Sequence, residues 1–333
     1  MGDIDPAVAS GPGAGQLAGG GLTPAQLRVL DELMARGRPR PRFERDLAMR
    51  LRADLEEAVA PLLGEGQEAL WVTKGALARV HACETHFRIA QEEPFAWNAG
   101  NARGTVAHRA LELSVSSGGD AAPLELVDRA LASLGADDPR GVLRPWLAQA
   151  EPLELADLRA GANDLVAKFV ECWPPFKASW APRTETRIGA DLCDGRVVLR
   201  GKVDLVLGLA RGQEARALVV DLKTGRAYPS HLDDLRFYAL VQTLRVGVPP
   251  FRVSSYYLDT ATFHAEDVTS ETLATAMART VDGVRKLLEL SHGRPATISP
   301  GPQCGWCRLS EACDGAAEWR EAKREAGGLD ADL

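Results

Sequence analysis

Two stretches decide the fold: Gly201-Lys202-Val203-Asp204 and Val219-Val220-Asp221-Leu222-Lys223-Thr224-Gly225. The segments around them, residues 196–209 and 217–223, carry β-branched residues with the period of two that is typical of strands. The segment between them, residues 210–216, contains Gly212 and polar residues, which indicates a hairpin loop. We therefore predict two antiparallel neighbours in a sheet.

The loop also predicts the register of this hairpin. A loop centred near Gly212 and Gln213 pairs residues whose numbers add up to about 425, and Asp204 and Asp221 meet that condition. Their side chains would lie roughly 5 Å apart if they share a face. Lys223, two residues after Asp221, points to the same face. The pattern predicts a cluster of two carboxylates and one ammonium group.

Two carboxylates held this close among apolar residues resist ionisation unless a cation joins them. A divalent ion with oxygen ligands meets that need, and Mg²⁺ or Mn²⁺ suits such a site. The ion would polarise a phosphate and activate a water, while Lys223 would orient or deprotonate that water or stabilise the transition state. The plainer alternative is a salt bridge from Lys223 to either aspartate at the end of a sheet.

Helical patterns surround the hairpin. Residues 1–22 are rich in Gly and Ala and predict a flexible leader, residues 23–70 a helical N-terminal region, and residues 321–333 a charged tail. A loop is expected over 114–122. Further strands are predicted over about 186–192 and 251–258, and helices over about 74–90, 102–113, 123–173, 231–246 and 270–291.

The composition is that of a globular protein, with 45% hydrophobic and 26% charged residues. No apolar run is long enough for a membrane span and no signal peptide is visible, so we expect a cytoplasmic protein without a membrane partner. A net charge of −7 argues against a protein that coats nucleic acid non-specifically. It still allows a local basic groove for phosphates, with these candidates: Arg183, Arg187, Arg196, Arg200, Lys202 and Arg226.

From Lys74 to Asp314 the ordered series of motifs resembles the nuclease domain of the RecB-like PD-(D/E)XK superfamily. The two strands precede a predicted helix that carries Tyr238, as in that family. The resemblance implies an α/β fold, a restriction-endonuclease-like core with a central mixed sheet flanked by helices. Here the nuclease domain would span residues 71–320, with helices inserted over 123–173. It also implies that the catalytic site contains the following residues: Asp204, Asp221, Lys223 and Tyr238.

Two more residues join the site through the resemblance. The segment Gly104-Thr-Val-Ala-His108-Arg-Ala-Leu111-Glu112 matches the family's Gly-x-x-x-His-x-x-Leu-Glu pattern. Its histidine implies a metal site formed by His108, Asp204 and Asp221. Glu185 resembles the family's upstream glutamate and is a further catalytic candidate. From the residues alone, a core histidine and an exposed charge at a strand end remain the alternatives.

One position departs from the family pattern. The family usually has Gln-x-x-x-Tyr, whereas this chain has Asp234-Leu-Arg-Phe-Tyr238. An aspartate accepts hydrogen bonds but cannot donate them as an amide does, and it adds negative charge near metal and phosphates. The exchange would either tune metal binding or weaken the grip on DNA.

Three of the six cysteines form a close array, Cys304-Gly-Trp-Cys307 followed by Cys313, and three thiolates at this spacing can share one centre. The resemblance supplies a fourth, because Cys83 stands where the iron–sulfur subset of these nucleases, similar to the AddB C-terminal and CRISPR-associated enzymes, carries a distant cysteine. It implies a [4Fe–4S] cluster. Zn²⁺ held by four thiolates and free buried cysteines are the alternatives. Cys172 and Cys193 belong to no motif and are expected in the core.

These patterns predict a metal-dependent DNA nuclease, an exonuclease acting on single strands or free ends in repair or recombination. Since the chain has no P-loop, unwinding would require a separate helicase as partner. The alternatives are a nucleic-acid-binding module of the same fold that has lost cutting, suggested by Asp234 and the acidic charge, and a zinc-stabilised assembly scaffold.

Overall fold

The computed structural model describes residues 21–93, 95–117, 121–136 and 143–325. Residues 1–20 of the predicted leader and 326–333 of the predicted tail lie outside the described residues. Among the described helices, none is both long enough and apolar enough to cross a lipid bilayer.

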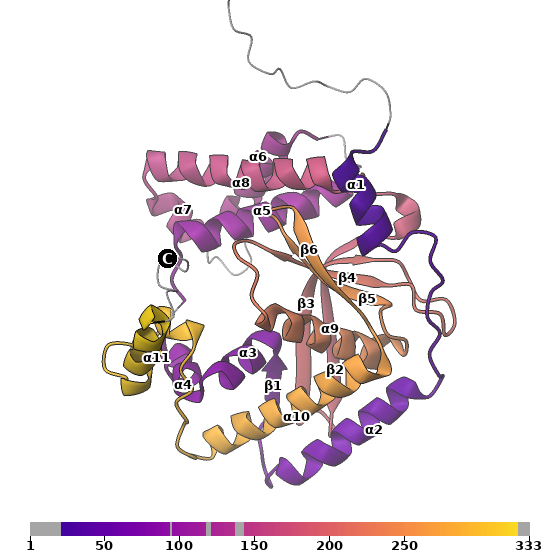
Figure 1. Ribbon diagram of the computed structural model, residues 1–333. Coiled ribbons are helices and arrows are strands. Elements are labelled where there is room, and N and C mark those ends of the chain that lie inside the picture. Colours follow the sequence, from indigo (N-terminus) through magenta and orange to yellow (C-terminus); the bar gives the residue numbers. More distant parts are fainter. Residues whose placement is uncertain (1–20, 94, 118–120, 137–142, 326–333) are drawn as a thin grey trace, which may run out of the picture.

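A mixed sheet forms the centre of the molecule (Figure 1). Strand β3 is antiparallel to β2 and β4 and parallel to β1, while β5 is parallel to β4 and antiparallel to β6. This arrangement confirms the predicted α/β class with a central mixed sheet. The six strands found in the described residues are β1 Leu70–Thr73, β2 Arg183–Leu192, β3 Val197–Leu207, β4 Leu218–Lys223, β5 Arg252–Tyr257 and β6 Thr262–Asp267.

The predicted hairpin register is confirmed. Strands β3 and β4 pair Leu205 with Val220 and Val206 with Val219, which is the register expected from a loop centred near Gly212. Gly208 and Gly212 both have positive φ, and a Cβ on Gly208 would lie 2.4 Å from the Arg216 carbonyl oxygen. Only glycine accommodates this close approach without strain.

Strands β1 and β4 share one edge of β3. Strand β1 pairs with β3 from Val197 to Arg200, and β4 pairs with it from Leu205 onward, whereas β2 runs along the other edge. The intervening stretch, residues 201–204, has no strand partner on the shared edge within the described chain. We call this opening in the sheet the fork.

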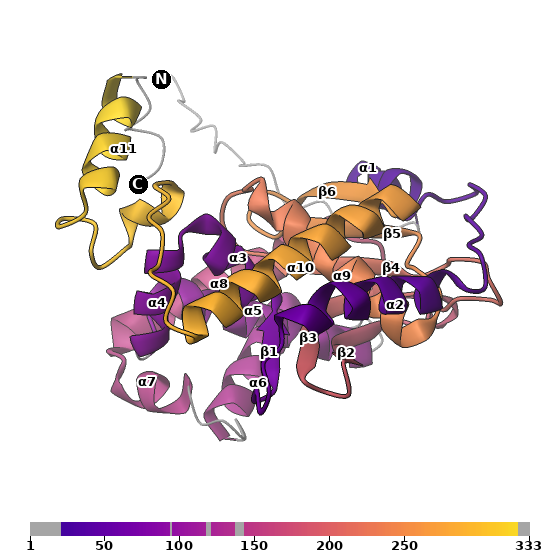
Figure 2. The same cartoon turned by 90° about the horizontal axis from the view of Figure 1, so that it is seen from below.

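Two helical layers cover the sheet (Figure 1). Helices α5 to α8, together with the segment Val29–Leu33 that follows α1, bury one apolar cluster, and α2, α9 and α10 bury the other. Figure 2 shows α11 at the same end of the molecule as α4. The helix bounds are α1 Pro24–Arg28, α2 Leu47–Val59, α3 Lys74–Ala82, α4 Glu84–Glu92, α5 Ala99–Ser116, α6 Pro123–Ala136, α7 Leu143–Gln149, α8 Pro152–Cys172, α9 Ser230–Val246, α10 Ser270–Ser291 and α11 Asp314–Glu325, with short turns at Val29–Leu33, Ala60–Leu62, Ala178–Trp180 and Pro302–Gly305.

Four details of the predicted elements are wrong. The single helix expected over 74–90 is two helices, because Cys83 adopts an extended conformation with φ −166° and ψ 119°. Helix α5 continues to Ser116, so the loop expected from residue 114 begins later. Strand β1 was not expected because four residues carry no clear periodicity, and β6 was not expected because its exposed sequence Thr-Phe-His-Ala-Glu-Asp is largely polar.

Candidate metal centre

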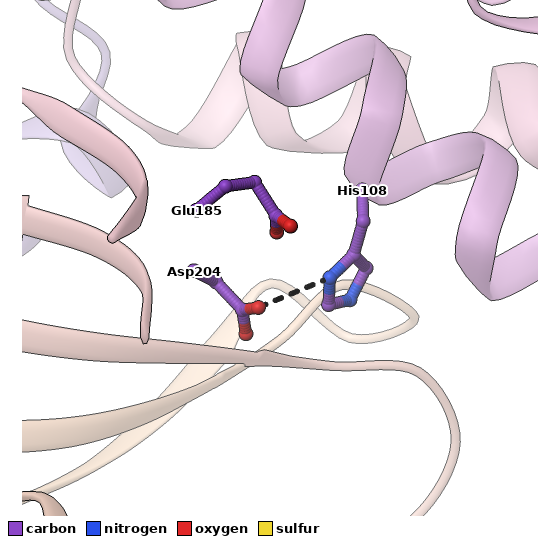
Figure 3. Close-up of side chains that lie close together, drawn as sticks. All are labelled: His108, Glu185 and Asp204. Carbon is purple, nitrogen blue, oxygen red and sulfur yellow. Dashed lines mark ion pairs between the residues drawn. The ribbon is translucent and has the colours of Figure 1, made fainter. Parts of the chain in front are cut away.

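Three potential metal ligands converge beside the fork: His108 from α5, Glu185 from β2 and Asp204 from β3 (Figure 3). One ligand atom from each lies within 4.8 Å of the others, and His108 Nδ1 is 3.4 Å from Asp204 Oδ1. One imidazole nitrogen and two carboxylate oxygens form a donor set that suits Mg²⁺ or Mn²⁺. The structure thus brings Glu185 together with His108 and Asp204, and Asp221 is not in this group.

The backbone places Glu185 and Asp204 by interrupting the regular sheet. Strands β2 and β3 pair Thr184 with Leu205 and Thr186 with Val203, and the two residues between them leave the ladder. Glu185 has φ 48°, a left-handed conformation that is uncommon for a residue of this type. Such local strain persists only where the surrounding structure imposes it. Here it accompanies a carboxylate that projects toward His108 and Asp204 (Figure 3).

Asp204 also closes the end of the hairpin. Its Oδ2 accepts a hydrogen bond from the Leu222 backbone N–H at 2.8 Å, beyond the last backbone pairing of β3 with β4. The carboxylate is therefore held by β4 on one side and lies next to His108 on the other.

Asp221 lies between two lysines. Lys74 Nζ and Lys223 Nζ are each 2.8 Å from one of its carboxylate oxygens, and Asp221 is only 2% exposed. Lys223 Nζ is also 3.3 Å from Asp234 Oδ2. The predicted pair of Asp221 and Lys223 thus exists, together with a second lysine that the sequence analysis missed.

Lys74 reaches Asp221 because of the fork. Strand β1 ends at Thr73, opposite Arg200 of β3, and the Thr73 side chain caps α3 by accepting a hydrogen bond from the Ala76 N–H. The first residue of α3 is therefore Lys74, at the place where the sheet opens. If β1 had been assigned from the sequence, the Thr73 cap at its end and its pairing with β3 would have placed Lys74 near the site.

Opposing effects set the protonation of this group. Burial lowers the pKa of the His108 imidazole, but the hydrogen bond to Asp204 and the charges of Asp204, Asp221 and Glu185 outweigh it and raise the pKa above its usual range. Burial raises the pKa of the Asp221 carboxyl, but Lys74 and Lys223 bring it below the usual range. Asp221 is therefore ionised at neutral pH.

Tyr238 lies behind this group on α9. Its hydroxyl donates a 2.7 Å hydrogen bond to the Lys202 carbonyl, and its ring packs so closely on Gly201 that a Cβ there would lie 2.8 Å away. Burial and the nearby carboxylates raise the pKa of the phenol, so it remains a donor. The contact fixes the β3 backbone two residues before Asp204.

A family profile for the PD-(D/E)XK nuclease superfamily matches residues 72–314. The chain belongs to this superfamily. The match begins within β1, ends at the start of α11, and includes every residue of the candidate metal centre.

Other comparisons are weaker than this family match. No curated protein matches the chain. The solved structures that are similar to it include SSO0001, with 14% identity, a TM-score of 0.32, and coverage of 79% of this chain and 94% of the other, and a protein named "Putative exonuclease" from Eubacterium rectale, with 12% identity, a TM-score of 0.43, and coverage of 80% and 90%.

Four of the six residues predicted to form a basic groove make contacts within the chain. Lys202 forms an ion pair with Glu185, Arg200 lies 2.8 Å from Asp191, and Arg183 donates to the Gly208 carbonyl. Arg196 donates to the Cys193 carbonyl. Lys202 adjoins the metal centre, because its partner Glu185 is one of the three converging ligands.

The four cysteines predicted to hold a cluster line one pocket: Cys83, Cys304, Cys307 and Cys313. The Ser299 N–H lies 3.5 Å from Cys83 Sγ and the Gly301 N–H lies 3.4 Å from Cys304 Sγ. Among the described residues, no three of these sulfurs fall within 4.8 Å of one another. Cys193 is buried and Cys172 half-buried, and the structure contains both as free thiols.

Proposed function

We propose that this chain is a metal-dependent deoxyribonuclease that hydrolyses phosphodiester bonds. The observation that carries the proposal is the convergence of His108, Glu185 and Asp204 within a PD-(D/E)XK domain, next to an ionised Asp221 held by Lys223. The products would be a free hydroxyl and a phosphate. Its role in DNA repair or recombination, and its action as an exonuclease on ends or single strands, belong to the same proposal.

The residues divide the work as follows. His108, Glu185 and Asp204 would hold the ion, with Asp221 as a further carboxylate beside it. A bound Mg²⁺ or Mn²⁺ would supply Lewis-acid activation of the phosphate and a nucleophile at neutral pH. Lys223 would place its ammonium group against the charge that develops on the phosphate.

The lysine pairs suggest how Lys223 is positioned. Asp221 and Asp234 both contact its Nζ, which fixes a flexible side chain in one orientation. Tyr238 acts in this scheme as a positioning residue through the Lys202 backbone. The negative charge of Asp234 would therefore help to hold the Lys223 ammonium group in place. An uncharged glutamine at this position could not do so through charge.

We also propose a [4Fe–4S] cluster at the four cysteines. The four cysteines line one pocket, and backbone N–H groups lie near the sulfurs of Cys83 and Cys304, an arrangement that would hydrogen-bond the thiolates of a bound cluster. The cluster would join α4 to the segment before α11.

The domain limits are likewise proposed. We assign residues 71–320 to the nuclease domain, with α6 to α8 as its inserted helices. The helical region over 23–70 packs on this domain, since Leu51 and Leu55 of α2 lie in the apolar cluster of α9 and α10.

Digestion of end-labelled DNA tests the proposed activity. Wild-type protein with Mg²⁺ or Mn²⁺ should degrade the label, chelator should stop it, and Lys223→Ala should lose it. Lys286→Ala is the matched control, because this lysine forms its ion pair with Asp282 on α10, away from the metal centre. Equal degradation by the wild type and Lys223→Ala would reject the assignment, whereas DNA binding without cutting by the wild type would favour the inactive binding module.

A further inference from the structure

A further pocket lies between the start of α9 and strands β5 and β6. It has a volume of about 520 Å³, within the range of roughly 300–1,000 Å³ that is typical of ligand sites. Four aromatic rings line it: Tyr228, His231, Tyr257 and His264. We call it the aromatic pocket.

The four rings form a continuous series. His231 and Tyr257 lie at 28° to each other with centroids 5.8 Å apart, while Tyr228 meets His231 edge-on and His264 meets Tyr257 edge-on, each at 5.5 Å. His231 Nδ1 lies 3.0 Å from the Tyr257 hydroxyl. Tyr228 is 42% exposed at the rim, so its ring is available to a ligand.

The sheet sets the distance from this pocket to the catalytic residues. Tyr257 pairs with Lys223 across the parallel β4 and β5 strands, and Ser255, also in the lining, pairs with Asp221. Adjacent strands lie about 4.8 Å apart. The pocket is therefore one strand away from Asp221 and Lys223.

The loop at the rim of the aromatic pocket is hydrogen-bonded, through Asp259, to a helix that also carries a metal-centre residue. Asp259 accepts a 2.6 Å hydrogen bond from the Gly225 N–H through Oδ2 and lies 3.1 Å from Arg103 Nη2 through Oδ1. Gly225 lies in the loop that leads from β4 to Tyr228, and Arg103 lies on α5, the helix of His108. This anchor holds the aromatic rim in a defined relation to the metal centre.

The charges of the pocket favour a base over a phosphate. Its described lining contains no lysine or arginine and includes Glu266, whose carboxylate is bound by Arg236. Burial, followed by the positive charge of Lys223, lowers the pKa of His231, so this ring is neutral at neutral pH. A phosphate would meet a carboxylate there without a compensating cation in the lining, whereas a nucleobase offers an uncharged π-face.

We propose that the aromatic pocket binds an unpaired nucleobase of the strand whose phosphate lies at the metal centre. Stacking on aromatic side chains holds bases of any sequence, so the pocket would favour single-stranded DNA or an unpaired end over paired duplex. This inference rests on the proposed nuclease function and identifies the form of substrate that the site accepts.

Binding measurements on Lys223→Ala separate the pocket from the cutting step. The probe is a fluorescein-labelled single-stranded oligonucleotide of about 12 nucleotides, a length within the site sizes of such proteins, in a series with one abasic residue moved along it. Lys223→Ala with Tyr228→Ala should bind the intact oligonucleotide roughly 5- to 100-fold more weakly than Lys223→Ala alone. The double variant of Lys223→Ala with Tyr228→Phe keeps the aromatic ring and should bind the oligonucleotide as tightly as Lys223→Ala alone.

The abasic series identifies the occupant. One abasic position should weaken binding to Lys223→Ala by a similar factor but have little effect in the Tyr228→Ala background, because the stacking partner is already absent. His231→Ala should give the same pattern. Equal affinities for all variants and all abasic positions, or no binding of the oligonucleotide, would overturn the proposed pocket. Failure of wild-type cleavage with this binding pattern intact would instead reject the nuclease proposal.

Discussion

The metal centre and the cysteine pocket both bring together residues that are distant in sequence, but they are built from different kinds of structural element. The residues of the metal centre come from β2, β3 and α5. Asp204 lies next to His108, and the neighbouring Asp221 lies between two lysines. The cysteine pocket joins the break between α3 and α4 to a loop and a short turn before α11. The first arrangement should persist without its ion, whereas the second should depend on its cluster.

The largest expected difference concerns catalysis. Asp204→Asn removes a carboxylate from the ligand group and should lower the cleavage rate by at least about 10²-fold, in the range reported for loss of a catalytic group. The melting temperature should change little, because asparagine can still accept the Leu222 N–H. Cleavage assays and thermal unfolding on the same preparation check both expectations. Normal cleavage by Asp204→Asn would show that Asp204 does not belong to the catalytic site.

The cysteine pocket should respond in the opposite way. Cys304→Ser should lose iron and the visible colour of the cluster and should unfold at a lower temperature, because the cluster closes a very long loop. Cys172→Ser is the matched control and should keep both properties. Stoichiometric zinc without colour in anaerobically purified protein would contradict the cluster assignment.

A smaller loss of stability is expected when hydrogen bonds between the start of α4 and the chain before the C-terminal cysteines are removed. Glu84 accepts hydrogen bonds from Arg294 and from the Thr297 N–H, and its side chain is 6% exposed. Glu84→Gln should lower the free energy of unfolding by about 2 kcal/mol at neutral pH. Glu289→Gln, which removes an exposed partner of the same arginine, should cost less than about 1 kcal/mol.

The pH dependence of the Glu84 effect has a defined sign. The hydrogen bonds from Arg294, followed by those from Thr297, lower the pKa of Glu84 from 4.5 to about 2. The stabilisation is therefore complete above pH 4.5 and is lost as the pH falls toward 2. Denaturant titrations at several pH values should show the wild type and Glu84→Gln converging in acid, and a constant difference would contradict this.

The smallest effect concerns Lys74. Its ammonium group is paired with Asp221 and would repel a divalent cation bound nearby. Lys74→Gln should therefore tighten Mn²⁺ binding roughly 3- to 10-fold, as expected from removing one charge several ångströms away in a partly screened site. Isothermal titration with Mn²⁺ measures it. Weaker binding would show that Lys74 supports the ligands instead of competing with the ion.

The sequence predicted the β3–β4 hairpin well because it depends on local patterns. The period of two in β3 and β4 and the turn at Gly212 sufficed for the register. Lys74 was missed because its position depends on β1, a four-residue strand paired with β3 more than a hundred residues later.

The site residues also divide into those that local patterns predict and those that depend on the tertiary structure. Asp221 and Lys223 follow from strand periodicity, but the residues alone left His108 open between ligand and core. Glu185 joins Asp204 through a local break in the ladder at φ 48°, which no propensity predicts for glutamate. The aromatic pocket combines a loop, a helix start and two strands, so only the assembled fold brings its rings together.

Cleavage of labelled single-stranded and duplex DNA, with Mg²⁺, with Mn²⁺ and with chelator, tests the central claim most directly. The account predicts metal-dependent hydrolysis by the wild type that is faster on single strands or unpaired ends and is lost in both Asp204→Asn and Lys223→Ala. Hydrolysis that persists in chelator, or that survives in either variant, would contradict it.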